Sequence, residues 1–254
     1  TSINYLGKDR SEYPEWMMRW HYSDDQDFIE YLSTLVHEIE SRCREDQLNL
    51  ISSEMFTMYG GMSHRQADRI HSVIPSAKII LVLRDPINRM KSFYKFNVEH
   101  EGFHLPLEEC IDWKSLPYVF YKRKPIYLPD FYYDNIIQSY CKQFGEENLC
   151  LLRFEDLTEK PKQFFAELAE FIGEDFNYEL NKAMLCQKEN ASSTDLKTHQ
   201  IRRKNLVHTA AKGLGIPFSS NEIEDIDLSS PVMPDPLRDR IINQLSGRCA
   251  GYYV

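Results

Sequence analysis

The segment Lys78–Leu83 (KIILVL), a continuous apolar run after its lysine, constrains the fold of this chain more than any other feature. The run is short, rich in β-branched residues and bounded by Pro75 and Pro86, which is typical of a strand in a parallel sheet covered on both faces. A helix is predicted to start near Pro86, because proline is favoured in the first turn of a helix, and to extend through about Val98. The run therefore predicts one strand–helix unit of an α/β fold.

Other segments repeat this alternation of strands and helices. Strands are predicted over residues 48–56 and 149–154, and helices over 24–44, 63–73, 131–144, 160–172 and 237–245. Residues 99–130 are rich in proline, glycine, histidine and aromatic residues, and we expect a long loop there. Because strands that alternate with helices form a parallel sheet covered on both faces, the sequence predicts one α/β domain over residues 1–254, with a central parallel sheet flanked by helices.

Charge and composition exclude several classes of partner. The formal net charge of −9 argues against nucleic acid or an anionic membrane as the main partner, since both favour a basic surface. No apolar run approaches the roughly 20 residues of a transmembrane helix, and cytoplasmic is the default location. The composition leaves the oligomeric state open.

No metal site is predicted. The six cysteines are scattered without a C-x-x-C pair, which argues against a zinc cage. His100 and His104 have the four-residue spacing of metal ligands on a helix, but Gly102 and Pro106 favour a loop there.

Arg84 and Ser92 are the first candidates for ligand binding. Ligands of parallel sheets bind at the carboxyl ends of the strands, where Arg84 is expected to lie. Its guanidinium can bind an oxyanion through two N–H groups, and Ser92, two turns into the following helix, can donate a hydroxyl. Together they can hold a phosphate from two sides. Spacing alone leaves open that Arg84 pairs with a nearby acid and Ser92 only packs.

Residues 84–94 (RDPINRMKSFY) resemble the 3′-phosphate-binding segment of sulfotransferases. The shared features are an arginine at a strand end, a proline two residues later, a serine eight residues after the arginine, and an aromatic pair directly after the serine. The resemblance implies that Arg84 and Ser92 hold the 3′-phosphate of the donor nucleotide. Arg89, between them, is expected to be a structural ion-pair partner.

Two further segments support this resemblance, which spans roughly residues 48–173. LLRFEDL (151–157), with the helical segment after it, is similar to a strand, Glu-Asp turn and helix of the same family, and ISSEMFTMY (51–59) resembles a segment of carbohydrate sulfotransferases. The chain looks closest to heparan N-deacetylase/N-sulfotransferase-like and bacterial sulfotransferases. This implies a P-loop-containing sulfotransferase-like fold, 3′-phosphoadenosine 5′-phosphosulfate (PAPS) as donor, 3′-phosphoadenosine 5′-phosphate (PAP) as product, and no metal.

The phosphate loop of this family has no counterpart in the sequence. TSINYLG (1–7) resembles the segment that normally follows that loop, so we expect the loop to precede Thr1. The alternative is a degenerate member of the family that lacks the loop.

Glu54 is the candidate general base. Sulfuryl transfer requires the acceptor to lose a proton, and a carboxylate at a strand end can take it if burial tunes its proton affinity. The alternative for Glu54 is a helix-capping or salt-bridging acid. Arg202 and Arg203, beside Lys204, can close over the 3′-phosphate as a basic loop does in relatives, or form a solvated basic turn.

The acceptor is expected to be a hydroxyl or amine of a small molecule or glycan. Glu54 favours a carbohydrate or small metabolite, and the aromatic residues of 113–133 can provide a platform for its rings. Two other functions stay open. One is an ATP-dependent small-molecule kinase of P-loop fold, and the other is a non-catalytic module that binds a glycan or a partner.

Overall fold

The described residues belong to two compact units of the chain. The computed structural model describes residues 3–6, 14–57, 63–112, 126–175 and 201. The first unit comprises residues 1–83 and 132–176, and the second comprises residues 84–131 and 177–254. That residues 1–254 form a single domain stays a prediction.

Strands β3 (Ile79–Leu83) and β6 (Leu149–Arg153) are paired in the first unit. They are parallel, in a register that runs from Ile79 opposite Leu149 to Leu83 opposite Arg153. This confirms both predicted strands and the parallel pairing. On β3 the alternate residues Ile79, Leu81 and Leu83 are buried, whereas Val82 is 50% exposed. One face of β3 therefore carries the core, although the continuous apolar run suggested burial on both faces.

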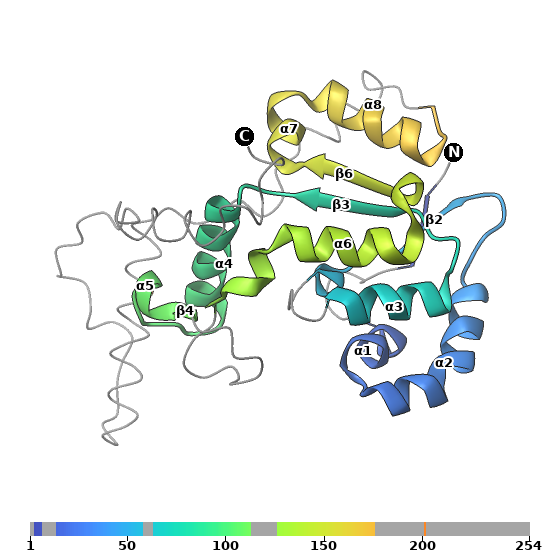
Figure 1. The fold of residues 1–254 in the computed structure, drawn as a ribbon, viewed down its shortest axis with the longest axis horizontal. Helices are drawn as coiled ribbons and strands as arrows, with labels where there is room; N and C mark the ends of the chain where they lie inside the picture. The colour runs from blue at the N-terminus through green and yellow to red at the C-terminus, as the bar shows by residue number, and fades with distance from the viewer. Residues whose placement is uncertain (1–2, 7–13, 58–62, 113–125, 176–200, 202–254) are drawn as a thin grey trace. The chain divides into compact units, whose positions relative to one another are not determined.

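Helices lie on both sides of this strand pair (Figure 1). Helices α7 (Phe154–Glu159) and α8 (Pro161–Ile172) contact β6, and α6 (Tyr133–Phe144) contacts both strands from the opposite side. Helices α6 and α8 agree with the predicted helices, but α7 replaces a predicted turn. These layers confirm the α/β class with parallel strands between helices.

Helix α3 (Ser63–Val73) packs along α6 through polar and aromatic contacts (Figure 1). The Ser63 and Ser139 hydroxyl oxygens are 3.2 Å apart, the Gln143 amide donates to Asp68, and the rings of His71 and Phe144 lie 5.5 Å apart. The predicted bounds of α3 are confirmed.

A second parallel pair joins β1 (Ile3–Tyr5) to β2 (Leu48–Leu50). The Asn4 amide donates to Asn49 Oδ1 at 2.8 Å. The prediction of a strand over 48–56 is correct only for its first residues, because the chain forms a 3-10 turn, η1 (Glu54–Phe56). Ser53 Oγ accepts from the Met55 amide at 3.2 Å, and such side-chain caps compete with extension of a strand. Strand β1 was not predicted, since three residues are too few to show a period.

Helices α1 (Glu15–Tyr22) and α2 (Asp25–Glu40) meet at a junction that Arg69 of α3 holds. The Arg69 side chain is 3% exposed and donates to the carbonyls of Trp20, Ser23 and Asp24 and to Asp25 Oδ1. Its guanidinium also lies 4.4 Å from the centre of the Phe28 ring. Arg69 therefore joins three helices through one buried cation.

The ends of these two helices agree only partly with the sequence. Asp24 caps α2 by accepting from the Asp27 amide at 2.8 Å, which agrees with the predicted start of this helix. Helix α2 ends at Glu40 rather than about Arg44. Helix α1 was not predicted, although its Trp16, Met17 and Trp20 are fully buried.

The described residues of the second unit form one long helix and several short elements. Helix α4 (Pro86–His100) confirms the helix predicted from Pro86 and extends it by two residues. The predicted loop of residues 99–130 contains α5 (Leu107–Cys110), β4 (Ile111–Asp112), β5 (Ile126–Tyr127) and the start of η3 (Leu128–Phe131), with β4 parallel to β5. The loop prediction is therefore partly wrong, because elements of two to four residues leave no periodic pattern.

Two predictions concern features beyond these elements. The helix predicted over 237–245 lies outside the described residues. Within the described ranges, no helix combines the length and the apolar character that crossing a membrane requires.

Replacing Arg69 by alanine tests the junction. We expect Arg69→Ala to lower the free energy of unfolding by about 2–4 kcal/mol, because buried carbonyls lose their donor. The control is Arg19→Ala, which breaks a pair whose side chains are 54% and 79% exposed and should cost less than about 1 kcal/mol. Urea unfolding of both variants measures the difference. Equal losses would contradict the role given to Arg69.

Candidate functional site

The carboxyl ends of β3 and β6 lie side by side in the first unit. Their register pairs Leu83 with Arg153, the last residues of the two strands. Arg84 follows Leu83 directly in the chain, and α7 begins directly after Arg153. Arg84 is therefore where the sequence predicted it, immediately after a parallel strand, at the sheet edge where α/β folds bind ligands.

Helix α4 begins at Pro86, two residues after Arg84, and Asp85 between them caps it. The Asp85 carboxylate accepts from the Asn88 amide at 2.8 Å, and the Asp85 carbonyl accepts from the Arg89 amide at 2.8 Å. Pro86 occupies the first turn, where the amide it lacks would have no partner in the helix. The Asp85 carboxylate offsets the partial positive charge of this helix N-terminus, so the Arg84 guanidinium is the group before α4 that can attract an anion. This part of the chain can stabilise an anion.

Ser92 lies in α4, about two turns after the cap. The helical repeat brings it to the side of α4 on which Asp85 and Arg89 lie, and both Ser92 and Arg84 are half-buried. Both residues belong to the second unit. Their joint binding of a phosphate stays a prediction.

Arg89 has a structural role in the second unit. Its guanidinium donates to the Asp130 carbonyl at 2.8 Å and lies 4.9 Å from the centre of the Phe131 ring. These contacts hold η3 against α4. The sequence predicted a structural residue here, and the described partners are a carbonyl and an aromatic ring.

Glu54 lies in the turn η1 of the first unit rather than at the end of a strand. Three residues separate it from β2, and its side chain is exposed. Glu54 therefore lacks the burial that was expected of a general base. The exposed carboxylate is accessible to an acceptor molecule. Its role as a base stays a prediction.

Residues of α1 and α6 hold the turn that carries Glu54. His21 Nε2 lies 3.1 Å from Ser53 Oγ, and the His21 ring lies 4.9 Å from the Phe56 ring. On the other side, the buried Tyr140 hydroxyl donates to the Phe56 carbonyl at 2.8 Å. The position of the turn is thus determined by tertiary contacts.

His21 is buried in this cluster, and its pKa is low. Burial is the main reason that the pKa of His21 is lowered to about 4. A hydrogen bond with Gln66 and the negative charge of Glu54 act to raise this pKa, whereas the positive charge of Arg69 acts to lower it. The imidazole is therefore neutral near pH 7. The sequence analysis did not identify His21, because it did not predict α1.

The aromatic residues proposed as an acceptor platform belong partly to the core. Phe131 is 3% exposed and Tyr133 is 2% exposed, so both are too buried to contact a ligand. Tyr127 and Tyr132 are half-buried, and those in 113–125 lie outside the described residues. In contrast, Tyr22 of α1 is 58% exposed. Partial burial raises the pKa of Tyr22, and the nearby negative charge of Glu54 raises it further.

The remaining predictions for the site concern the basic cluster near Arg202 and a possible metal site. Arg202 and Arg203 lie outside the described residues, so their contact with a phosphate stays a prediction. Among the residues that the structure describes, no three side chains of His, Cys, Asp or Glu gather as a metal site would require.

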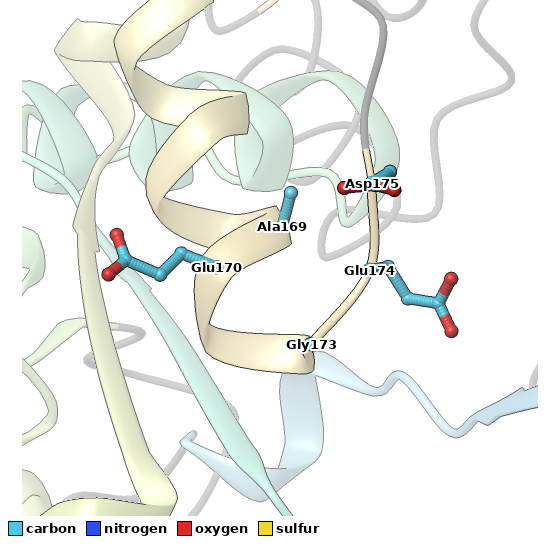
Figure 2. A pocket seen from close by; sticks show the side chains of 5 residues that line it. All are labelled: Ala169, Glu170, Gly173, Glu174 and Asp175. Atoms are coloured by element: carbon cyan, nitrogen blue, oxygen red, sulfur yellow. The ribbon is translucent and has the colours of Figure 1, made fainter.

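An acidic hollow lies at the end of α8 (Figure 2). Its volume is about 470 Å³, and it is lined by Ala169, Glu170, Gly173, Glu174 and Asp175. Figure 2 shows the three carboxylates pointing in different directions rather than toward a common point. A lining of this charge repels phosphate and sulfate groups, so the hollow does not fit the nucleotide that the sequence predicts.

Comparison with known proteins identifies the family. Residues 3–225 match the family model of the sulfotransferase domain, which is most of the chain. The chain belongs to the sulfotransferase family. No curated protein matches the sequence. Among solved structures, the chain is similar to a sulfotransferase from Alicyclobacillus acidocaldarius, with a TM-score of 0.46, 18% identity, and coverage of 84% of this chain and 81% of that chain.

The low pKa of His21 predicts how the stability of this sulfotransferase depends on pH. The unfolded chain binds a proton on histidine at about pH 6.5 and the folded protein only at about pH 4, so the unfolded state holds more protons between these values. Stability should therefore decrease from pH 6.5 to pH 4, by up to about 3 kcal/mol from this residue. Urea unfolding across this range measures the effect. In His21→Gln, whose new side chain does not titrate, the free energy of unfolding should depend less on pH over this range. An unchanged pH dependence in this variant would contradict the role given to His21.

Proposed function

We propose that the protein transfers a sulfuryl group from PAPS to a hydroxyl or amine of a carbohydrate or small metabolite. The observation that carries this proposal is the sulfotransferase family match over residues 3–225, which contains the segment from Arg84 to Ser92. The position of Arg84, after a parallel strand and before a capped helix, supports it. A kinase of similar scaffold leaves both observations without an explanation.

The donor side of the proposed site is cationic. The half-buried Arg84 guanidinium fits an anionic phosphate, because it offers several N–H donors and a full positive charge. Arg84 would bind the 3′-phosphate through two N–H groups, with the Ser92 hydroxyl as a further donor. Arg202 and Arg203 would add positive charge over the same phosphate.

The Glu54 carboxylate is the proposed base for the acceptor. PAPS supplies the sulfuryl group, whose bond to the phosphate oxygen breaks while the acceptor oxygen or nitrogen bonds to sulfur. Glu54 takes the proton that the acceptor loses, and the electrons of the broken bond leave with the phosphate of PAP. An acceptor bound over the exposed Glu54 would exclude water from the carboxylate and so bury it during the reaction.

Binding of PAP tests the donor side. We expect PAP to raise the melting temperature of the protein and Mg·ATP not to, because only PAP carries the 3′-phosphate. Arg84→Ala should weaken PAP binding by about 2–5 kcal/mol, the range for removing one partner of a desolvated charge pair. The control is Arg42→Ala. The Arg42 side chain is 46% exposed and belongs to the first unit, so this variant should bind PAP as the wild type does. Stabilisation by Mg·ATP instead of PAP would favour the kinase.

Transfer of labelled sulfate tests the reaction. Sulfur-labelled PAPS is incubated with glucosamine, oligomers of N-acetylglucosamine and 4-nitrophenol, and we expect label in at least one acceptor. Glu54→Gln should lower turnover by roughly 10²–10⁴-fold with PAP affinity nearly unchanged, because it removes only the proton acceptor. Glu30→Gln changes an exposed carboxylate of α2 and serves as the control. PAP binding without transfer to any acceptor would favour the binding module.

A further inference from the structure

The turn that carries Glu54 is short and has little structure of its own. It contains a single 3-10 turn, in which the Thr57 amide donates to the Glu54 carbonyl at 3.2 Å. One such turn is weak by itself, because it satisfies few backbone groups. The direction in which Glu54 points therefore depends on the groups that hold the turn from outside.

Ser53 is the residue of this turn that His21 of α1 contacts through a polar group. Its hydroxyl oxygen caps η1 by accepting from the Met55 amide at 3.2 Å, and the same oxygen lies 3.1 Å from His21 Nε2. A hydroxyl has one donor and two acceptor positions, so Ser53 can accept from the amide and donate to a neutral imidazole at once. His21 thereby fixes the rotamer of the cap immediately before Glu54.

The packing around position 21 requires an aromatic ring but does not by itself require the ring nitrogens of a histidine. It is 5% exposed, and its ring lies against Phe56 on one side and 6.4 Å from the ring of Tyr22. A phenylalanine would fill this space without the cost of burying two ring nitrogens. The polar ring is explained if its hydrogen bond to Ser53 matters.

The groups around His21 keep it neutral. Arg69 of α3 opposes a proton on the ring, Gln66 of α3 hydrogen-bonds it, and Glu54 of η1 attracts a positive charge, but burial outweighs the attraction and lowers the pKa of His21 to about 4. A protonated His21 would need to donate from Nε2, and its positive charge would attract the negative charge of Glu54. A neutral His21 leaves the carboxylate available to an acceptor.

We infer that His21 is a positioning residue for sulfuryl transfer, which holds the Ser53-capped turn so that Glu54 can take the proton of the acceptor. This inference rests on the proposed function, because it assigns to Glu54 the role of the base. His21 itself does not contact the substrate. Its effect reaches the reaction only through Ser53 and the direction of the Glu54 carboxylate.

Substitution of His21 by phenylalanine tests the inference. His21→Phe keeps the aromatic contact with Phe56 and removes the hydrogen bond to Ser53. With the acceptor that the labelled-sulfate assay identifies, kcat should fall about 10- to 100-fold, as expected for a misplaced catalytic group. The KM for that acceptor and the Kd for PAP should stay within about twofold, because neither ligand contacts His21. His21→Gln, whose side chain can still hydrogen-bond Ser53, should recover part of the lost kcat.

Two controls separate positioning from folding. His71→Phe changes another histidine that packs on a phenylalanine, in α3, and should leave kcat unchanged. The double variant His21→Phe with Ser53→Ala should lose no more kcat than the larger of the two single losses, since both act through one hydrogen bond. The kcat values are compared at a temperature where unfolding curves show every variant folded.

The outcomes distinguish the inference from the proposed function. Normal kcat in His21→Phe, with wild-type transfer intact, would overturn the role of His21 and leave the proposed function standing. Equal loss of kcat in His21→Phe and His21→Gln would also overturn it, because the hydrogen bond would then not matter. A wild-type protein that transfers sulfate to no acceptor would overturn the proposed function, and the inference with it.

Discussion

The buried guanidinium of Arg69 is the interaction on which the helical layer of the first unit depends. It donates to three main-chain carbonyls and one carboxylate at the junction of α1 and α2, so those two helices keep a defined position on α3. A buried cation without such partners would be strongly unfavourable, which makes the junction specific. Trp20, one of these acceptors, directly precedes His21. The geometry around Glu54 therefore depends on a cation that is in another helix.

In the second unit, other groups hold the helix and the turn next to it. Asp85 caps α4, and Arg89, one turn later, attaches the chain at Asp130 and Phe131 to the same helix. Asp85 thus fixes the start of α4, and Arg89 fixes η3 on the same helix. The two arginines of this segment have different tasks: Arg89 stabilises the fold, and Arg84 stays the candidate for the donor phosphate.

The proposed chemistry divides between these two kinds of structure. The proposed donor requires positive charge that is present before binding, and the Arg84 guanidinium after the end of β3 is the candidate for it. The acceptor requires a base that is accessible and correctly directed, and an exposed carboxylate on a turn held by tertiary contacts meets that requirement. In this sulfotransferase the acceptor side is therefore more dependent than the donor side on packing between helices distant in sequence.

The sequence by itself determined the elements whose signals are local. The run from Lys78 to Leu83 predicts β3, Pro86 predicts the start of α4, and the segment from Arg84 to Ser92 carries the resemblance to the family, because strand propensity, helix starts and short motifs depend on neighbouring residues. It missed the short elements, above all α1 and the turn η1, because segments of this length show little period. Only the tertiary structure decided that Glu54 is exposed and that His21 is buried beside Ser53. Burial and contacts between residues 21 and 53 depend on how the helices pack, which no local pattern encodes.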